Sequence, residues 1–291
     1  MSEAMPARCM LDPKRFVVRL PTRTIIAACS LATFLCTAAA CVDAPEARSP
    51  WHGWTTLRMK AKSVPLLRGR VELRLSEDVG GRRLETSTTA SFIGATIARS
   101  ETTTILDSVS GRTKEYRSLS SRKGRRYTFG EQGYVVEKLR RAKQGDDDWE
   151  VTSTKEFPYP GSDDSGSERR LYDYYGMLLD LGAAPLDAPG DETTLHVATS
   201  KGPQAYRIRV EESRRGERAF KDLKTGQMTK LPAREFRLTV APADPKAAEG
   251  FLNMEGDLEI WVEAETKTLL EIVGKVPKVP GKVKLVLSAM G

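Results

Sequence analysis

The most reactive side chains of this sequence are four cysteines that all lie within its first 41 residues: Cys9, Cys29, Cys36 and Cys41. Cys41 follows Ala38 and Ala40 near the end of a run, residues 24–42, that contains no charged side chain. Small residues directly before a cysteine are typical of a bacterial lipoprotein signal, although Ala38 stands where that signal usually has Leu. We therefore predict that Cys41 becomes the first residue of the mature chain and is acylated on its thiol.

A basic stretch precedes this uncharged run and contains five basic side chains against two acidic ones: Arg8, Lys14, Arg15, Arg19, Arg23, Glu3 and Asp12. Basic, then apolar, then small residues is the order of a secretory signal. Two alternatives to a lipid anchor stay open. The signal is cleaved and leaves a free periplasmic protein, or the segment stays as a membrane helix, which needs about 20 apolar residues.

The N-terminal segment therefore predicts an exported protein with three parts. Residues 1–41 are a signal peptide, lipoprotein signal or anchor, residues 42–50 are a tether, and residues 51–291 are the folded domain. We expect this domain on the periplasmic face of the cell envelope, held at a membrane, with the outer membrane favoured.

Histidines and acidic clusters are the remaining candidates for chemistry. His52 and His196 have no cysteine or second histidine nearby, and the acidic runs at 146–150 and 163–168 lack the alternating ligand spacing of a calcium loop. We expect no catalytic residue, no metal site and no cofactor. A hydrolase built on two converging carboxylates is the weakest alternative, since it needs two acids with separated pKa values.

Charge does not indicate nucleic-acid binding. The whole chain is +7, but without the five basic and two acidic residues of the first 40, the remaining 41 and 37 leave +4. The basic and acidic residues alternate, as in Arg70, Glu72 and Arg74, instead of forming a basic stripe. This pattern is typical of a solvated sheet face.

The apolar residues alternate in the same way and predict antiparallel strands. Val71, Leu73 and Leu75 share one face, and the pattern returns at 206–211, 236–240 and 258–263. Further strands are predicted at 55–61, 83–98, 102–107, 114–119, 126–129, 134–140, 149–157, 195–199, 268–276 and 282–287.

One segment has helical spacing. Ser165 and Glu168 fit a capping box, and apolar residues then recur at positions 171, 174, 175 and 178 before a stop at Gly182. The spacing predicts one amphipathic helix of about four turns.

One helix cannot cover the apolar face of ten or more strands, so the sheet must curl on itself. The predicted fold is mainly β: a single curled antiparallel sheet, or half-barrel, with one central amphipathic helix. Such a sheet often encloses an apolar cavity. Tyr172, Tyr175 and Leu178 of the helix are the candidate ligand-binding residues, although aromatic residues on a helix over a sheet are usually plain core.

Three C-terminal segments, residues 256–262, 265–272 and 281–285, resemble the closing strands of the bacterial exported family catalogued as domain of unknown function 3108. A strand pair around Tyr116 and Tyr127 before the tyrosine-rich segment fits the same order. Leu270 differs from the usual Pro of that family, and the helix lacks its Asp-x-x-Ser and Tyr-x-x-Arg features. The resemblance spans most of residues 65–287. It implies a curled sheet similar to that of outer-membrane lipoprotein carriers and sorting proteins, which hold acyl chains in a concave cavity. That family has no established activity, and no functional residue is carried over.

These observations lead to two hypotheses. The first is a non-enzymatic envelope protein that binds a lipid, an acyl chain or another hydrophobic ligand in a concave cavity and meets the membrane through its N-terminal anchor. The second is a lipid-anchored structural or protein-interaction module with a filled core and no ligand, whose protein partner the sequence does not name. A cavity larger than about 300 Å³ on the concave face would favour the first.

Overall fold

The computed structural model describes residues 54–62, 67–78, 81–92, 95–108, 110–142, 148–161, 170–244, 251–276, 279 and 281–291. They belong to one compact unit, Arg48–Gly291. The predicted signal or anchor with Cys41, the tether 42–50 and the capping box of Ser165 and Glu168 lie outside these described residues. Within the described ranges, no helix has both the length and the apolar character needed to cross a membrane.

The described part of the chain folds into strands that all join one sheet, together with one short α-helix and one 3-10 helix. The strands are β1 (Thr56–Ala61), β2 (Leu67–Asp78), β3 (Gly81–Phe92), β4 (Ala95–Asp107), β5 (Thr113–Ser120), β6 (Lys123–Phe129), β7 (Gly133–Arg141), β8 (Trp149–Pro158), β9 (Leu171–Tyr172), β10 (Glu192–Thr199), β11 (Gly202–Asp222), β12 (Met228–Pro242), β13 (Glu255–Glu263), β14 (Leu269–Lys275) and β15 (Lys282–Met290). The helices are α2 (Tyr174–Asp180) and the 3-10 turn η2 (Phe251–Asn253).

Neighbours in the sheet are mostly neighbours in the chain. The order is β8-β7-β6-β5-β4-β3-β2-β1-β15-β14-β13-β12-β11-β10-β9. The first strand therefore lies between β2 and the last strand, and Leu57 pairs with Met290. The pairings are antiparallel except for β9 with β10 and a short contact of β11 with β15.

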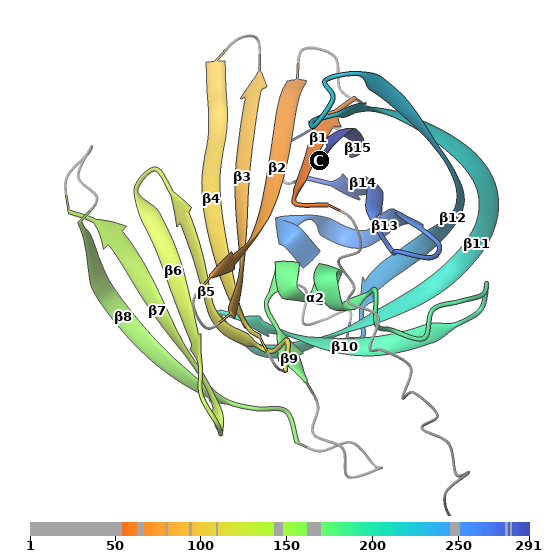
Figure 1. Cartoon of the computed structure of the whole chain (residues 1–291). Helices are drawn as coiled ribbons and strands as arrows, with labels where there is room; N and C mark the ends of the chain where they lie inside the picture. Colours follow the sequence, from red (N-terminus) through yellow and green to blue (C-terminus); the bar gives the residue numbers. More distant parts are fainter. Residues whose placement is uncertain are drawn as a thin grey trace, which may run out of the picture. The chain divides into compact units, whose positions relative to one another are not determined.

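That short contact closes part of the sheet. The hairpin of β11 and β12 is long, and at its far end Lys221 and Asp222 pair with Ala289 and Met290 of β15. Strands β11–β15 therefore form a closed ring, which we call the ring section. Strands β2–β8 end at the free edge of β8 and form the open section (Figure 1). The predicted fold class, a mainly β curled sheet with one helix, is confirmed.

The helix differs from its prediction. α2 has seven residues, and its N-cap is Asp173, whose carboxylate accepts from the backbone N–H groups of Tyr175 and Gly176. Leu171 and Tyr172, which were predicted inside the helix, form β9 and pair with His196 and Val197 of β10. The predicted four-turn helix is therefore wrong in length, because a buried cap starts the helix later and the preceding residues join the sheet.

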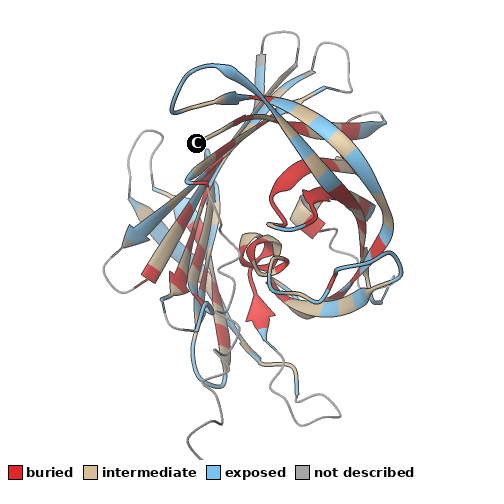
Figure 2. Cartoon of the chain, turned by 45° about the vertical axis from the view of Figure 1, so that its right-hand side comes forward, coloured by how far each residue is buried: buried red, intermediate tan, exposed pale blue. Residues whose placement is uncertain are grey.

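The main core lies on the face of the sheet that packs against α2, which we call the inner face (Figure 2). It draws on β1–β4, α2 and β10–β14, and includes Met59, Leu84, Met177, Leu238 and Ile260, none of which is more than 1% exposed. A second, smaller cluster gathers the inner-face aromatic residues of β5–β8. The alternation predicted these faces, because residues two apart on a strand point the same way.

Candidate functional site

Asp173 fixes the helix against the open section. Its buried carboxylate accepts hydrogen bonds from Thr104 at 3.0 Å and Thr113 at 2.9 Å, in addition to the two helix N–H groups. Burial raises the pKa of Asp173, and these four donors partly oppose that rise. A Cβ at Gly176 would lie 2.7 Å from a carboxylate oxygen of Asp173, so only glycine allows this close approach. The fixed helix positions Tyr174 and Tyr175, which directly follow Asp173 in the chain.

The three predicted ligand residues lie in different surroundings. The hydroxyl of Tyr172 donates to Asp180 at 2.5 Å, and the Tyr175 ring lies 6.5 Å from that of Tyr116. Burial and the nearby Asp173 charge raise the pKa of Tyr175 to about 12. Leu178 lines a space of only about 30 Å³. The side chains do not line one common cavity, and their role in ligand binding stays a prediction.

A row of aromatic side chains crosses the inner face of the open section. Tyr127 lies 5.3 Å from Tyr116 and 6.3 Å from Tyr134, measured between ring centroids, and Tyr134 lies 5.3 Å from Phe157. The hydroxyl of Tyr134 donates to the carbonyl of Thr199 on β10 at 2.9 Å. This bond ties the open section to the strands beyond α2.

Beside this row lies a groove of about 690 Å³ on β5–β8, which we call the basic groove. It is lined by Tyr116, Ser118, Ser120, Arg122, Lys123, Gly124, Arg125, Tyr127, Lys138, Leu139, Arg140, Thr152 and Tyr174. Five of these side chains are basic and none is acidic. Its three tyrosines are each no more than 8% exposed, so they add a small apolar surface beside the positive charges.

The register sets like charges opposite each other in this groove. Arg125 lies directly across from Lys138, and Lys123 lies directly across from Arg140. Like charges in directly opposed positions destabilise a sheet. Within the described residues, none of these four side chains makes an ion pair, and Glu150, which is opposite Arg140, does not lie within ion-pair distance of it.

Charged residues at two other places in the sheet have partners of opposite charge. On the other face of the same two strands, Arg126 pairs with Glu137 at 2.5 Å. Lys275 and Lys282 are also directly opposed, on β14 and β15, but one binds Glu255 at 3.0 Å and the other binds Glu259 at 2.9 Å. The basic groove therefore differs from these positions in lacking a carboxylate beside its opposed cations.

The ring section holds buried charges of another kind. Arg218 donates to Glu235 of β12 at 2.7 Å and to Glu271 of β14 at 3.0 Å. Burial disfavours the ionised form of Glu235, but hydrogen bonds and charge from Arg218 and Arg214 outweigh it and hold its pKa below the ordinary value. Arg218 binds both Glu235 and Glu271, so these contacts hold the C-terminal end of β11 against the sheet.

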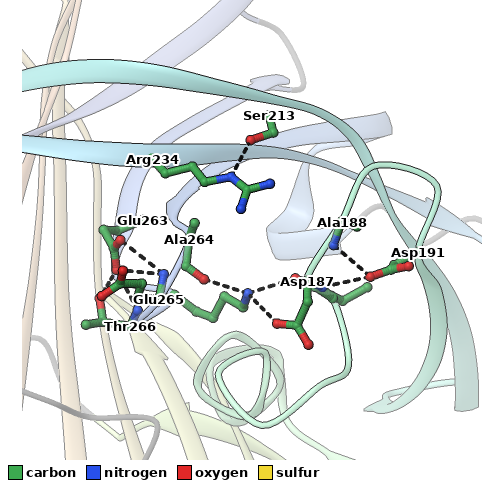
Figure 3. A network of polar contacts seen from close by, with 11 residues as sticks. Asp187, Ala188, Asp191, Ser213, Arg234, Glu263, Ala264, Glu265 and Thr266 are labelled. Carbon is green, nitrogen blue, oxygen red and sulfur yellow. Dashed lines mark hydrogen bonds and ion pairs between the residues drawn. The ribbon is translucent and has the colours of Figure 1, made fainter.

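Lys267 is buried and, like Arg218, makes structural contacts. In Figure 3 its side chain is the unlabelled one between the labelled Ala264 and Asp187. Its Nζ donates at 2.7 Å to the carbonyl groups of both Leu186 and Ala264, and burial lowers its pKa. Glu263 accepts from the backbone N–H groups of the same turn. These contacts fasten the loop after α2 to the turn between β13 and β14. Among the described residues, no three His, Cys, Asp or Glu side chains gather as a metal site would require.

This chain is similar to a protein of known structure. One neighbour is the crystal structure of a β-barrel-like protein of domain of unknown function DUF1849 from Brucella abortus. The two chains are 12% identical, the match covers 81% of this chain and 95% of that one, and the TM-score is 0.47. No family model matches this chain, and no curated protein matches it. The resemblance to domain of unknown function 3108 and to lipoprotein carriers is not confirmed.

The basic groove was not predicted from the sequence. The signal was present, because alternation places Lys123 and Arg125 on the same face as Tyr127, and Lys138 on the same face as Val136. The opposition of Arg125 to Lys138 depends on the register across the turn at 130–132, which alternation alone does not define.

Proposed function

We propose that this chain is an exported, non-enzymatic binding module of the cell envelope, anchored through residues 1–41, which holds a lipid-like amphiphile in the basic groove. The observation that carries the proposal is the size of that groove. Its volume of about 690 Å³ exceeds the roughly 300 Å³ at the lower end for ligand pockets. The space beside Leu178 of the helix, about 30 Å³, is too small for a ligand.

The composition of the groove fits an amphiphile. Tyr116 and Tyr127, which are no more than 6% exposed, contribute a small apolar surface to the groove, while Arg125 and Lys138 face the adjacent part of the same groove. Aromatic residues with a polar end suit a site where one part of the ligand is apolar and the other is wet. The site is open along β5–β8, so part of a long ligand extends into solvent.

The filled space around α2 favours a second candidate, an interaction module that takes no ligand. The main core on this face is closely packed, with Met177 and Leu181 no more than 1% exposed. Under this alternative the basic groove is a solvated surface of the domain.

Native mass spectrometry of the full exported chain, in a detergent that is released in the gas phase, separates the two candidates. The first predicts a co-purifying adduct of lipid mass that is lost on denaturation. Ser118→Trp, which fills the groove, is expected to abolish the adduct, whereas Thr128→Trp on the outer face of β6 keeps it. A protein without adduct that also takes up no added lipid would contradict the proposal.

A further inference from the structure

We infer that the basic groove selects amphiphiles with a phosphate-bearing anionic head group, held between the opposed pairs Arg125–Lys138 and Lys123–Arg140. This inference rests on the proposed function and names the ligand class of the same site.

The opposed cations of the groove repel each other. Two like-charged pairs occupy successive inner-face positions on β6 and β7, and all four side chains are exposed. Each opposed pair costs stability in the ligand-free sheet. An anion bound between the pairs attracts all four cations. Binding therefore relieves their mutual repulsion, and this relief favours the bound state.

The spacing of the four cations also suits a phosphate group. Neighbouring strands lie about 4.8 Å apart, and residues two positions apart on a strand are separated by about 6.6 Å. The four cations therefore start from the corners of a rectangle of about 5 by 7 Å, wide enough for two anionic groups or one phosphate with its ester linkage. Arg125 and Arg140 offer planar forks that bind phosphate oxygens in pairs, while the lysines act as point charges.

Two neighbouring rows of side chains orient the ligand in the groove. The row formed by Ser118, Arg125 and Lys138 lies directly beside the row formed by Tyr116, Tyr127 and Val136. A head group among the cations therefore has its apolar chain on the tyrosine side. Ser120, whose hydroxyl donates to the carbonyl of Lys123 at 2.7 Å, fixes the turn that presents this lysine.

Isothermal titration calorimetry on the full exported chain tests the inference with three probes. They are short-chain phosphatidic acid, short-chain phosphatidylcholine and inorganic pyrophosphate. We expect phosphatidic acid to bind at least about 10-fold more tightly than phosphatidylcholine, and its affinity to fall as salt is raised. The double variant Arg125→Gln/Lys138→Gln is expected to lose about 10- to 100-fold in affinity for phosphatidic acid.

The matched control removes charge from the other face of the same strands. Arg126→Gln/Glu137→Gln breaks the outer-face ion pair and is expected to change the affinity by less than about 3-fold. A similar loss in both double variants would overturn the inference, because it would show a general effect on the strands.

The probes separate failure of the inference from failure of the proposed function. Equal binding of the two lipids overturns the selection for an anionic head and leaves a lipid-binding module. Binding of pyrophosphate alone supports the phosphate chemistry but overturns the lipid as its source. No binding of any probe overturns both.

Discussion

Arg218 of the ring section and Arg125 of the open section have opposite surroundings. Arg218, with its side chain 17% exposed, contacts two carboxylates whose side chains are no more than 2% exposed, and joins strands that are not neighbours. Arg125 is exposed and faces Lys138 without an acidic partner. The same residue type is therefore structural in one section and available to a ligand in the other. The pairing of the strands explains the difference, since it brings Arg218 beside Glu235 and Glu271 but sets Arg125 opposite Lys138.

Two buried carboxylates extend this comparison. Glu235 of the ring section has a lowered pKa because arginines contact it, while burial raises the pKa of Asp173 beside the open section and its neutral donors only partly oppose that rise. Their effects on stability therefore have opposite dependence on pH.

The largest expected effect on stability comes from a substitution in the ring section. Glu235→Gln should lower the free energy of unfolding by about 3 kcal/mol at pH 7, because it leaves Arg218 and Arg214 without their shared carboxylate. The lowered pKa of Glu235 gives stability that is present above about pH 4.3 and lost as pH falls through its folded value. Urea denaturation at several pH values should show the difference from wild type shrinking in acid. A difference that is independent of pH would contradict this account of Glu235.

A smaller effect on stability, with the opposite dependence on pH, is expected at the helix cap Asp173. Asp173→Asn should change stability near pH 4 by less than about 1 kcal/mol, because Asn caps a helix about as well as Asp. The raised pKa of Asp173 means that its contribution is complete below about pH 3.9 and is lost as pH rises through the folded value. The variant should therefore gain on wild type between pH 4 and pH 7 in the same urea experiment. If wild type gains instead, the carboxylate is stabilised in its ionised form.

The smallest effect sharpens the contrast between the two sets of arginines. Without ligand, Arg125→Gln/Lys138→Gln should raise the free energy of unfolding by up to about 0.5 kcal/mol, because it removes a repulsive pair. The gain should fall as salt is raised, since salt screens exposed charges. Thermal unfolding in low and high salt measures it. A loss of stability in low salt would show that these cations have an attractive partner.

Most strands could be predicted from the sequence because alternation marks their two faces, but β9 was missed and only parts of β11 and β12 were predicted. The predicted strand at 83–98 was too long, since β3 ends at Phe92 and β4 begins at Ala95. The helix start was missed because the hydroxyl partners of Asp173, Thr104 and Thr113, lie far away in the sequence. Ring closure depends likewise on a distant pairing, that of Lys221 with Ala289. Local patterns contain no information on such contacts.

The place of β1 between β2 and β15 also bears on how the chain folds. Leu57 finds its partner Met290 only when almost the whole sequence is present, and such non-local pairing is slow. The middle of the sheet therefore stays unfinished until β15 is available to pair. During that interval β1 and β14 each have an unpaired edge that promotes aggregation. Folding of this domain is therefore timed by the arrival of the nine residues of β15, Lys282–Met290.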